Sequence, residues 1–249
     1  MFWIFNKLKT QPNYLFENLV DIHNHILPGI DDGCNSISES LKMVKIYKEL
    51  GFKKVIPTPH IFHDRYPNNS KSISVSYKKL IQSQANIRPF ISDPAAEYML
   101  DENFLINLKS SSKLLLISGK YILIEIPFFG TLDAINACTL EFEKLKITPI
   151  LAHPERYHNI NKIDSFKKLK DRGILFQLNL LSFMGYYGVR IKDKAKAIFN
   201  SNLYDCVSSD AHSSRDLEKL KKLNFSKNNL FNWNRLKENH LSLFSNSNL

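Results

Sequence analysis

Short apolar runs alternate along the chain with longer amphipathic stretches. The runs are rich in Ile, Leu and Val, which is typical of strands that are buried on both faces of a parallel sheet. They lie at residues 19–23, 53–58, 88–93, 121–126, 148–152, 174–178 and 204–208. The stretches between them predict helices at residues 36–50, 70–86, 101–118, 131–145, 162–172 and 189–202. Strands that alternate with helices indicate parallel β-α-β units.

Residues 36–50 give the clearest helix. Ser36 and Glu39 have the spacing of a capping box. Gly51 stands where a helix C-cap is expected, and apolar residues recur between these signals at helical spacing.

Seven predicted strands favour an α/β fold, a seven-stranded (β/α)7 TIM-like barrel with one unit fewer than the standard eight. An open doubly wound sheet is the alternative. The 249 residues suit one barrel domain over residues 1–249, and no low-complexity linker interrupts them. We expect residues 1–18 to form an N-terminal extension and residues 223–249 a helical C-terminal tail.

The composition is that of a globular protein, with 43% apolar and 23% charged residues. The formal net charge of +10 fits either solvated helix faces or attraction for an acidic partner, and charge alone does not decide between them. The N-terminal MFWIFNKLKT has only five apolar residues before its basic ones, which is neither a signal peptide nor a membrane span. We therefore expect no stable membrane insertion. A weak membrane contact, a partner contact and packing on the domain stay open for this segment.

The three cysteines, Cys34, Cys138 and Cys206, show no metal-binding or disulfide spacing. An odd count without a signal peptide indicates a reducing, cytoplasmic location. None has an arginine six positions later, so the Cys-x5-Arg loop of thiol-based phosphatases is absent.

Histidine and acidic residues fall at or near the ends of six of the seven predicted strands. The carboxyl ends of parallel strands converge on one face of a barrel, where active sites lie. The residues so placed are His23, His25, His60, Glu97, Glu125, His153, Asp210 and His212. Each one alone could be a core histidine or a structural salt bridge, but their joint placement by coincidence is improbable.

Two spacings and one interruption sharpen this prediction. His23 and His25 lie on the same face of a strand because side chains alternate, and Asp210 and His212 repeat the spacing. Glu125 interrupts the apolar run YILIEIPF, and a buried carboxylate is costly unless it is paired or bound to metal.

Imidazole and carboxylate donors without thiolate are typical of sites that bind Mn, Fe or Zn, and they do not resemble a structural zinc site built from cysteines. These donors are too numerous for one ion, so two or three ions are expected. Clustered divalent ions can activate water and clamp the oxygens of a phosphate displacement.

The motifs resemble the PHP (polymerase and histidinol phosphatase) superfamily, and more closely its bacterial protein tyrosine phosphatases of capsule and exopolysaccharide operons. The match runs from about residue 19 to about residue 215. It is carried by DIHNHILPGIDDG, VIPTPH, AAEYMLD, ILIEIPF, ILAHPERY, QLNLLSFMGYYG and VSSDAH. The resemblance implies a distorted seven-stranded barrel, Mn2+ as the usual ion, and phosphotyrosine on a bacterial tyrosine kinase tail as substrate. It favours this phosphoprotein over nucleic acid as the partner and leaves a homo-oligomer open.

The resemblance also implies a trinuclear site with all ligands in place. One ion would be held by His23, His25, Glu97 and Asp210, a second by Glu97, Glu125 and His153, and a third by Asp32, His60 and His212. Arg156 matches an arginine that contacts the substrate phosphate, and a guanidinium suits bidentate phosphate binding. Asp210 and His212 would lie near the leaving group.

Two other functions stay open at this point: a different PHP phosphoesterase of the histidinol phosphatase kind, and an inactive metal-binding scaffold. The loop after His60, which contains His63 and Tyr66, is expected to vary between family members and to affect partner choice.

Overall fold

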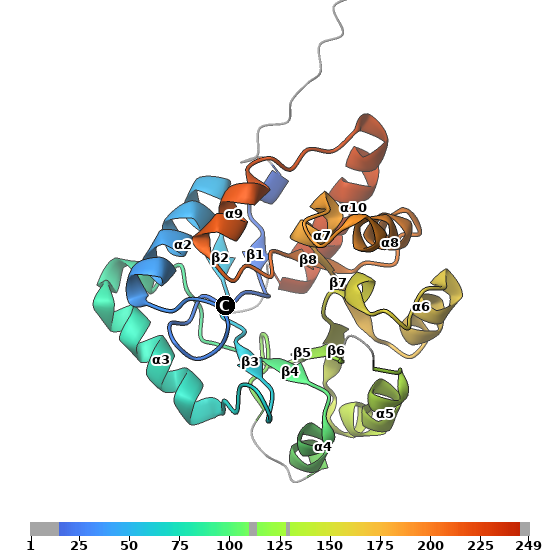
Figure 1. The fold of residues 1–249 in the computed structure, drawn as a ribbon, viewed down its shortest axis with the longest axis horizontal. Coiled ribbons are helices and arrows are strands. Elements are labelled where there is room, and N and C mark those ends of the chain that lie inside the picture. Colours follow the sequence, from blue (N-terminus) through green and yellow to red (C-terminus); the bar gives the residue numbers. More distant parts are fainter. Residues whose placement is uncertain (1–14, 110–113, 128–129, 245–249) are drawn as a thin grey trace, which may run out of the picture.

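The computed structural model describes residues 15–109, 114–127 and 130–244. Within these ranges, short strands lie at the centre and helices surround them (Figure 1). The strands are β1 (Val20–Asp21), β2 (Lys54–Val55), β3 (His60–Ile61), β4 (Glu97–Met99), β5 (Tyr121–Glu125), β6 (Thr148–Leu151), β7 (Leu175–Asn179) and β8 (Cys206–Ser208).

All the strand pairs are parallel, as the alternating pattern predicts. The six strands β3 to β8 form one sheet in sequence order, and β1 pairs with β2 in a second, two-stranded sheet. Backbone hydrogen bonds continue beyond the strands themselves. After β8 and β1, the amide of Asp210 donates to the carbonyl of His23 at 2.8 Å, and before β4 the amide of Ser92 donates to the carbonyl of Val55 in β2 at 2.9 Å. The result is an α/β fold with a curled parallel sheet. Among the described residues, the predicted seven strands in one continuous barrel sheet are not observed.

The prediction for the second and third strands was wrong in detail. Residues 53–58 contain only the two-residue β2, the unpredicted β3 follows them, and residues 88–93 contribute only an isolated bridge between Val55 and Ile91. The strand that takes the place of the predicted third strand is β4, which contains Glu97 itself. Prolines at positions 57, 59, 89 and 94 explain the difference, because proline has no amide to donate to a strand ladder.

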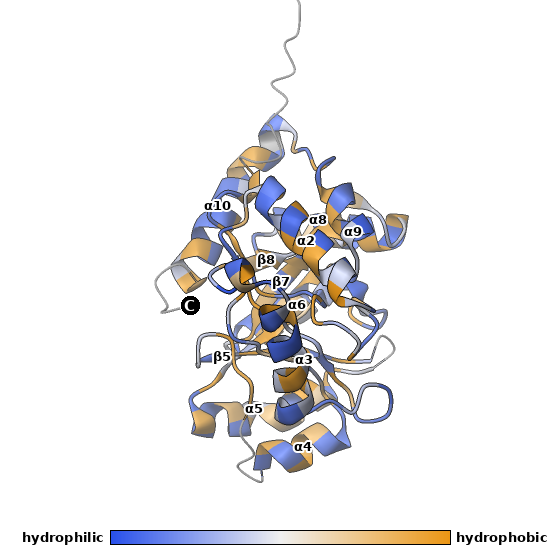
Figure 2. Cartoon of the chain, turned by 90° about the vertical axis from the view of Figure 1, so that its left-hand side faces the viewer, coloured by the Kyte–Doolittle hydropathy of each residue, from blue (hydrophilic) through white to orange (hydrophobic). Residues whose placement is uncertain are grey.

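The helices carry hydrophobic residues beside hydrophilic ones, as expected for helices that pack one side against a sheet (Figure 2). They are α2 (Ile37–Leu50), α3 (Ser70–Ser83), α4 (Glu102–Lys109), α5 (Asp133–Leu145), α6 (Ile163–Lys170), α7 (Leu180–Met184), α8 (Val189–Asn200), α9 (Ser214–Leu220) and α10 (Lys227–Phe244), with 3-10 turns η1 (Ala85–Ile87) and η2 (Pro154–Arg156). Each of the six predicted helices is present. The one expected at residues 101–118 ends early at Lys109, with 110–113 outside the described residues. The short helices α7 and α9 were not predicted, and α10 occupies the expected C-terminal tail.

The N-terminal cap of α2 differs from the predicted capping box. The Ser36 hydroxyl accepts a hydrogen bond from the Glu39 amide at 3.2 Å, as expected. The Glu39 carboxylate, however, accepts from the amide of Ser214 at 2.8 Å and so caps α9 instead. Gly51 ends α2 with a φ of +88°, which confirms the predicted C-cap.

The sheet is buried on both faces. A large apolar cluster fills the space between the strands and the surrounding helices, and a smaller cluster lies apart from it and includes Val20, Leu123 and Ile150 from three strands. Phe244 at the end of α10 belongs to this smaller cluster. The buried histidines and carboxylates are therefore concentrated where the strands end.

The N-terminal segment is described only from residue 15 onward. Leu15 and Phe16 are buried, and the Phe16 ring stacks on Phe52 at 5.1 Å and meets the edge of Trp233 at 6.5 Å. The alternatives for residues 1–14 lie outside the described residues. Within the described chain, no helix combines the length and apolar character that crossing a membrane requires.

Candidate metal centre

The structure brings all nine predicted ligands together at the carboxyl ends of the strands. They form four overlapping groups whose donor atoms lie within 4.8 Å of one another. The groups are His25, Asp32, His60 and His212; His23, His25 and Asp210; His23, Glu97 and His153; and His60, Glu97 and Glu125.

The two histidines of the His-x-His motif face two carboxylates. His23 Nε2 lies 3.0 Å from Glu97 Oε2 and 3.2 Å from Asp210 Oδ1. His25 Nε2 lies 3.5 Å and 3.4 Å from the same two oxygens. Strand alternation therefore directs both rings to one point, as the spacing predicted.

Glu97 lies at the middle of the site. Its Oε1 is 3.1 Å from His153 Nε2, and its Oε2 is 3.1 Å from His60 Nδ1. The same His60 nitrogen is 3.0 Å from Glu125 Oε1. This arrangement follows from the register of the sheet, in which His60 is opposite Glu97 on the neighbouring strand.

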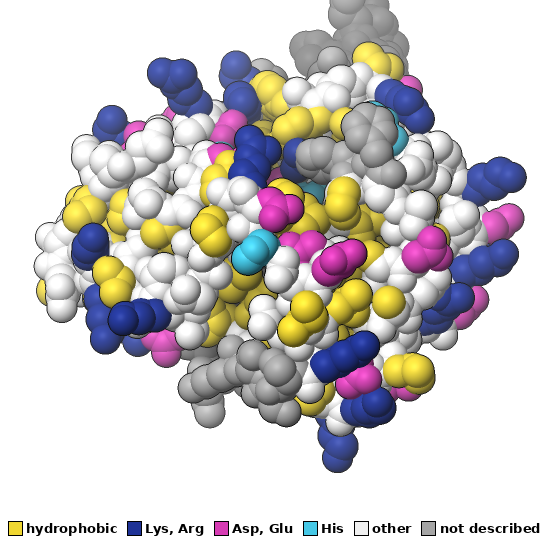
Figure 3. Space-filling model, turned by 60° about the horizontal axis from the view of Figure 1, so that its bottom comes forward, with side chains coloured by type: hydrophobic (Ala, Val, Ile, Leu, Met, Phe, Trp, Pro, Cys, Tyr) yellow, Lys and Arg dark blue, Asp and Glu magenta, His cyan; other side chains and the backbone are white. Residues whose placement is uncertain are grey.

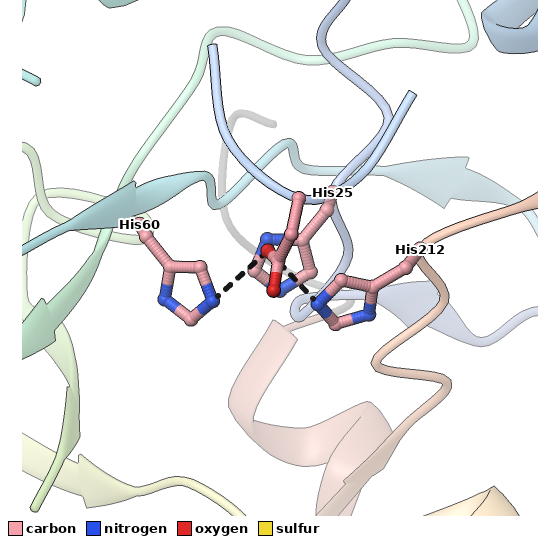
Figure 4. A group of neighbouring side chains, drawn as sticks. His25, His60 and His212 are labelled. Carbon is pink, nitrogen blue, oxygen red and sulfur yellow. Dashed lines mark ion pairs between the residues drawn. The ribbon is translucent and has the colours of Figure 1, made fainter. Parts of the chain in front are cut away.

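Asp32 lies on the more open side of the site. His60 Nε2 and His212 Nε2 each approach its Oδ1 at 3.4 Å, from opposite sides, with His25 close behind (Figure 4). The rings of His25 and His212 stack at 3.9 Å. The side chain of Asp32 is 41% exposed and that of His212 26%, whereas Glu97 is fully buried, so the site is open to solvent on the Asp32 side.

Two residues that orient the histidines were not predicted. Asp31 Oδ2 lies 2.8 Å from His25 Nδ1, and Gln177 Oε1 lies 3.0 Å from His23 Nδ1. Each contact fixes the ring so that Nε2 faces the other donors. Asp31 directly precedes Asp32, and Gln177 interrupts the apolar run ILFQL, so both left a signal in the sequence.

The mutual contacts shift the ionisation of these groups. Burial disfavours charge on His25 and His60, but Asp31 raises the pKa of His25 to about 10, and Glu97 with Asp32 and Glu125 raises that of His60 to about 12. Burial likewise opposes ionisation of Glu97, yet the neighbouring imidazoles hold its pKa well below the usual value. Protons and divalent ions therefore compete for the same atoms.

The donor atoms fit metal ions. His23 Nε2, His25 Nε2, His60 Nδ1 and Glu97 Oε2 are buried and make no hydrogen bond of acceptable geometry, although each lies close to other donors. Unsatisfied buried polar atoms are costly, and a shared cation satisfies them together. The mixture of imidazole and carboxylate suits manganese, iron or zinc.

The backbone is unusual at two of the nine residues. His153 has a φ of +33° and Asp210 a φ of +51°, in the left-handed region that non-glycine residues rarely adopt. Such conformations cluster at functional sites, where surrounding structure maintains them. Here they turn the chain directly after β6 and β8.

Arg156 lies beside the nine residues, in the turn η2. Its Nη1 donates to Asp210 Oδ2 at 2.9 Å, and its guanidinium lies 4.6 Å from the centre of the Tyr187 ring. Asn179 Nδ2 donates to the same Asp210 oxygen at 2.6 Å. Asp210 thus presents Oδ1 to the histidines and Oδ2 to Arg156 and Asn179.

Six of the nine residues line a cavity of about 230 Å³, which Arg156 also lines. These six are Asp32, His60, Glu125, His153, Asp210 and His212. On the face shown in Figure 3, most Lys and Arg side chains lie near the outline and do not form one continuous basic patch. The net charge is therefore spread on this face, as the solvated-face interpretation predicts.

This fold and site define a class: α/β proteins with a candidate polynuclear metal centre of histidines and carboxylates at the ends of parallel strands. The chain belongs to the family described as capsular polysaccharide synthesis, CpsB/CapC, whose model matches residues 19–223. This confirms the resemblance of its motifs to bacterial tyrosine phosphatases of capsule operons.

Similar proteins match most of the chain. The chain is 29% identical over 198 residues to the putative tyrosine-protein phosphatase CapC of Staphylococcus aureus, covering 78% of this chain and 77% of that protein. It is 28% identical over 200 residues to the tyrosine-protein phosphatase YwqE of Bacillus subtilis, covering 78% of each. A solved structure from the study of YwqE and of CpsB from Streptococcus pneumoniae, described as unique metal-dependent tyrosine phosphatases, superposes with a TM-score of 0.76 at 25% identity, over 93% of this chain and 96% of that one.

Proposed function

We propose that this protein is a metal-dependent protein tyrosine phosphatase that hydrolyses phosphotyrosine on a bacterial tyrosine kinase controlling capsular or exopolysaccharide synthesis. The observation that carries the proposal is the cluster of nine histidine and carboxylate donors, six of which line a cavity together with Arg156. Membership of the CpsB/CapC family supports it.

In this proposal the nine residues hold three divalent ions, with manganese as the expected metal. His23, His25, Glu97 and Asp210 bind one, Glu97, Glu125 and His153 a second, and Asp32, His60 and His212 a third. Ions held there supply Lewis acidity that activates water and neutralises phosphoryl charge.

The protein's own groups then act on the phosphate ester. A guanidinium has five N–H donors, so Arg156 can keep its bond to Asp210 and also bind phosphoryl oxygens. In the proposal, the leaving phenolate gains a proton from water or from an acid near Asp210 and His212. A cysteine nucleophile does not fit, because all three cysteines are buried and burial raises the pKa of Cys34 and Cys138 to about 12.

We further propose that residues 1–249 act as one domain and that β2 and β3 serve as a single interrupted strand of a distorted seven-stranded barrel. The proposed setting is cytoplasmic, with the tyrosine-containing tail of the kinase as the partner.

The decisive experiment is hydrolysis of para-nitrophenyl phosphate and of a phosphotyrosine peptide, before chelation, after chelation and after manganese is restored. We expect activity that chelation removes and manganese restores, and that His23→Ala and Arg156→Ala both lose. Full activity in chelator together with strong vanadate inhibition would contradict the proposal.

A further inference from the structure

The cavity at the metal centre has two unlike sides. One side consists of candidate metal ligands and Arg156. Arg65 also lines the cavity. The rest of the other side is largely apolar and consists of Phe62, Tyr66, Met99, Ile126 and Pro127. We refer to these five residues as the apolar wall. A cavity of about 230 Å³ is smaller than the ~300–1,000 Å³ of drug-sized ligand sites, so it suits one side chain of a substrate.

The part of the apolar wall that follows β3 is a short hairpin held in place by hydrogen bonds. The amides of Phe62 and Tyr66 each donate to the carbonyl of the other, at 2.9 and 2.7 Å. The Tyr66 ring lies parallel to that of His60, with 5.3 Å between centroids and 9° between planes. Asn68 Nδ2 donates to the carbonyls of His60 at 3.0 Å and Ile30 at 2.7 Å. The hairpin is therefore fixed relative to a candidate metal ligand.

The opposite part of the apolar wall is equally fixed. Met99 ends β4 and is 8% exposed, and Ile126 follows Glu125 and is fully buried. Because these residues directly continue the strands that carry Glu97 and Glu125, apolar surface begins where the ligand set ends. A phosphorylated side chain that delivers its phosphate to the ligands must pass its middle part along this surface.

We propose that the apolar wall binds the phenyl ring of phosphotyrosine and makes the site selective for aryl over alkyl phosphate esters, with Phe62 as a specificity-determining residue. The inference rests on the proposed function and adds the reason for its substrate class. An aromatic ring gains from offset or edge contacts with Phe62 and from burial against Met99 and Ile126. Phosphoserine and phosphothreonine have no ring to fill this surface.

Binding of two phosphonates to the manganese-loaded protein tests this directly. We expect wild-type protein to bind phenylphosphonate about tenfold more tightly than methylphosphonate, from the usual gain of an aromatic contact together with apolar burial. Phe62→Ala should reduce that ratio about three- to tenfold without changing methylphosphonate binding. In Phe62→Leu the ratio should lie between those of wild type and Phe62→Ala, and this variant serves as the folded comparison if Phe62→Ala is unstable. Phe231→Ala is the matched control, because Phe231 is 76% exposed on α10.

Two results would overturn the inference: an unchanged ratio in both Phe62 variants, or equal weakening of both phosphonates, which would mean that the wall only shields the metal site. Turnover of phosphotyrosine and phosphoserine peptides of one sequence separates the inference from the proposed function. If neither peptide is turned over but the protein still prefers phenylphosphonate in a Phe62-dependent way, the proposed function is refuted and the role of the apolar wall is supported. Turnover of both peptides at equal rates would refute the wall alone.

Discussion

At the scale of single residues, the site depends as much on the groups behind the histidines as on the ligands themselves. Asp31 and Gln177 each contact the Nδ1 atom of one histidine and so direct its Nε2 inward. Such partners of metal ligands set both the tautomer and the basicity of the ring.

Asp31 tests this role with a change of one atom. Asp31→Asn can place an N–H donor against His25 Nδ1, which favours the tautomer with a proton on Nε2 and so opposes metal binding there. We expect manganese affinity to fall about 10- to 100-fold. Titration calorimetry, with manganese added to protein that a chelator has freed of metal, measures this affinity. Asp93→Asn, at a side chain that is 80% exposed, is the control. Unchanged affinity in Asp31→Asn would show that His25 needs no orienting partner.

Arg156 tests phosphate recognition. Arg156→Lys keeps the positive charge but removes the planar pair of donors, so charge and geometry can be separated. We expect kcat/KM for a phosphotyrosine peptide to fall about 100-fold, on the order of the 3 kcal/mol that a preorganised charge-assisted contact contributes. Arg88→Lys is the control, because Arg88 forms a surface ion pair with Asp93. If the lysine variant retains wild-type kcat/KM, a bidentate contact is not required.

At the scale of elements, α10 closes the fold on the side of the smaller apolar cluster. His240 of this helix is fully buried, and its Nδ1 accepts a hydrogen bond from the Val207 amide of β8 at 3.3 Å. Its ring also lies 4.9 Å from that of Phe244. Burial lowers the pKa of His240 to about 3, so the folded protein keeps this imidazole neutral.

This neutral histidine predicts a pH dependence of stability. Above the unfolded pKa of about 6.5 the group is neutral in both states, and as the pH falls the unfolded chain binds a proton that the folded chain does not. The free energy of unfolding should therefore decrease by about 2 kcal/mol between pH 7 and pH 5 through this group alone. Denaturant titrations of wild type and His240→Gln at both pH values measure the difference. A glutamine keeps an acceptor for the Val207 amide, and an identical pH dependence in the two proteins would contradict the prediction.

The elements also show which parts of the architecture a sequence can predict. Glu125 was identified because a charge inside an apolar run is conspicuous, and β5 matched its predicted strand almost completely. The strand of Glu97 was missed because Pro89 and Pro94 break the pattern before it, and its pairing with β3 and β5 depends on distant segments. Gln177 illustrates the same limit, since its partner His23 is 154 residues away. Periodicity locates strand ends, but contacts across the sheet arise only on folding.

At the scale of the whole molecule, the candidate metal centre connects nearly the full length of the chain. Its nine residues extend from His23 to His212 and lie in or after six separate strands. Their carboxylates and imidazoles balance one another in the metal-free protein, at the cost of buried groups without hydrogen bonds. Metal binding should therefore stabilise the entire fold rather than one loop.

The last prediction follows from this connection. A ligand that binds only the folded state stabilises it by about 2.7 kcal/mol at a concentration 100 times its dissociation constant. For a chain of this size that energy corresponds to a rise in Tm of about 5–10 °C. We expect manganese to produce such a shift in chelated wild-type protein, as measured by calorimetry. In His60→Ala the shift should be much smaller, because His60 contacts Asp32, Glu97 and Glu125 at once. His158→Ala, at a histidine outside the nine, should respond like wild type. A manganese shift of the same size in His60→Ala would mean that the ions bind elsewhere.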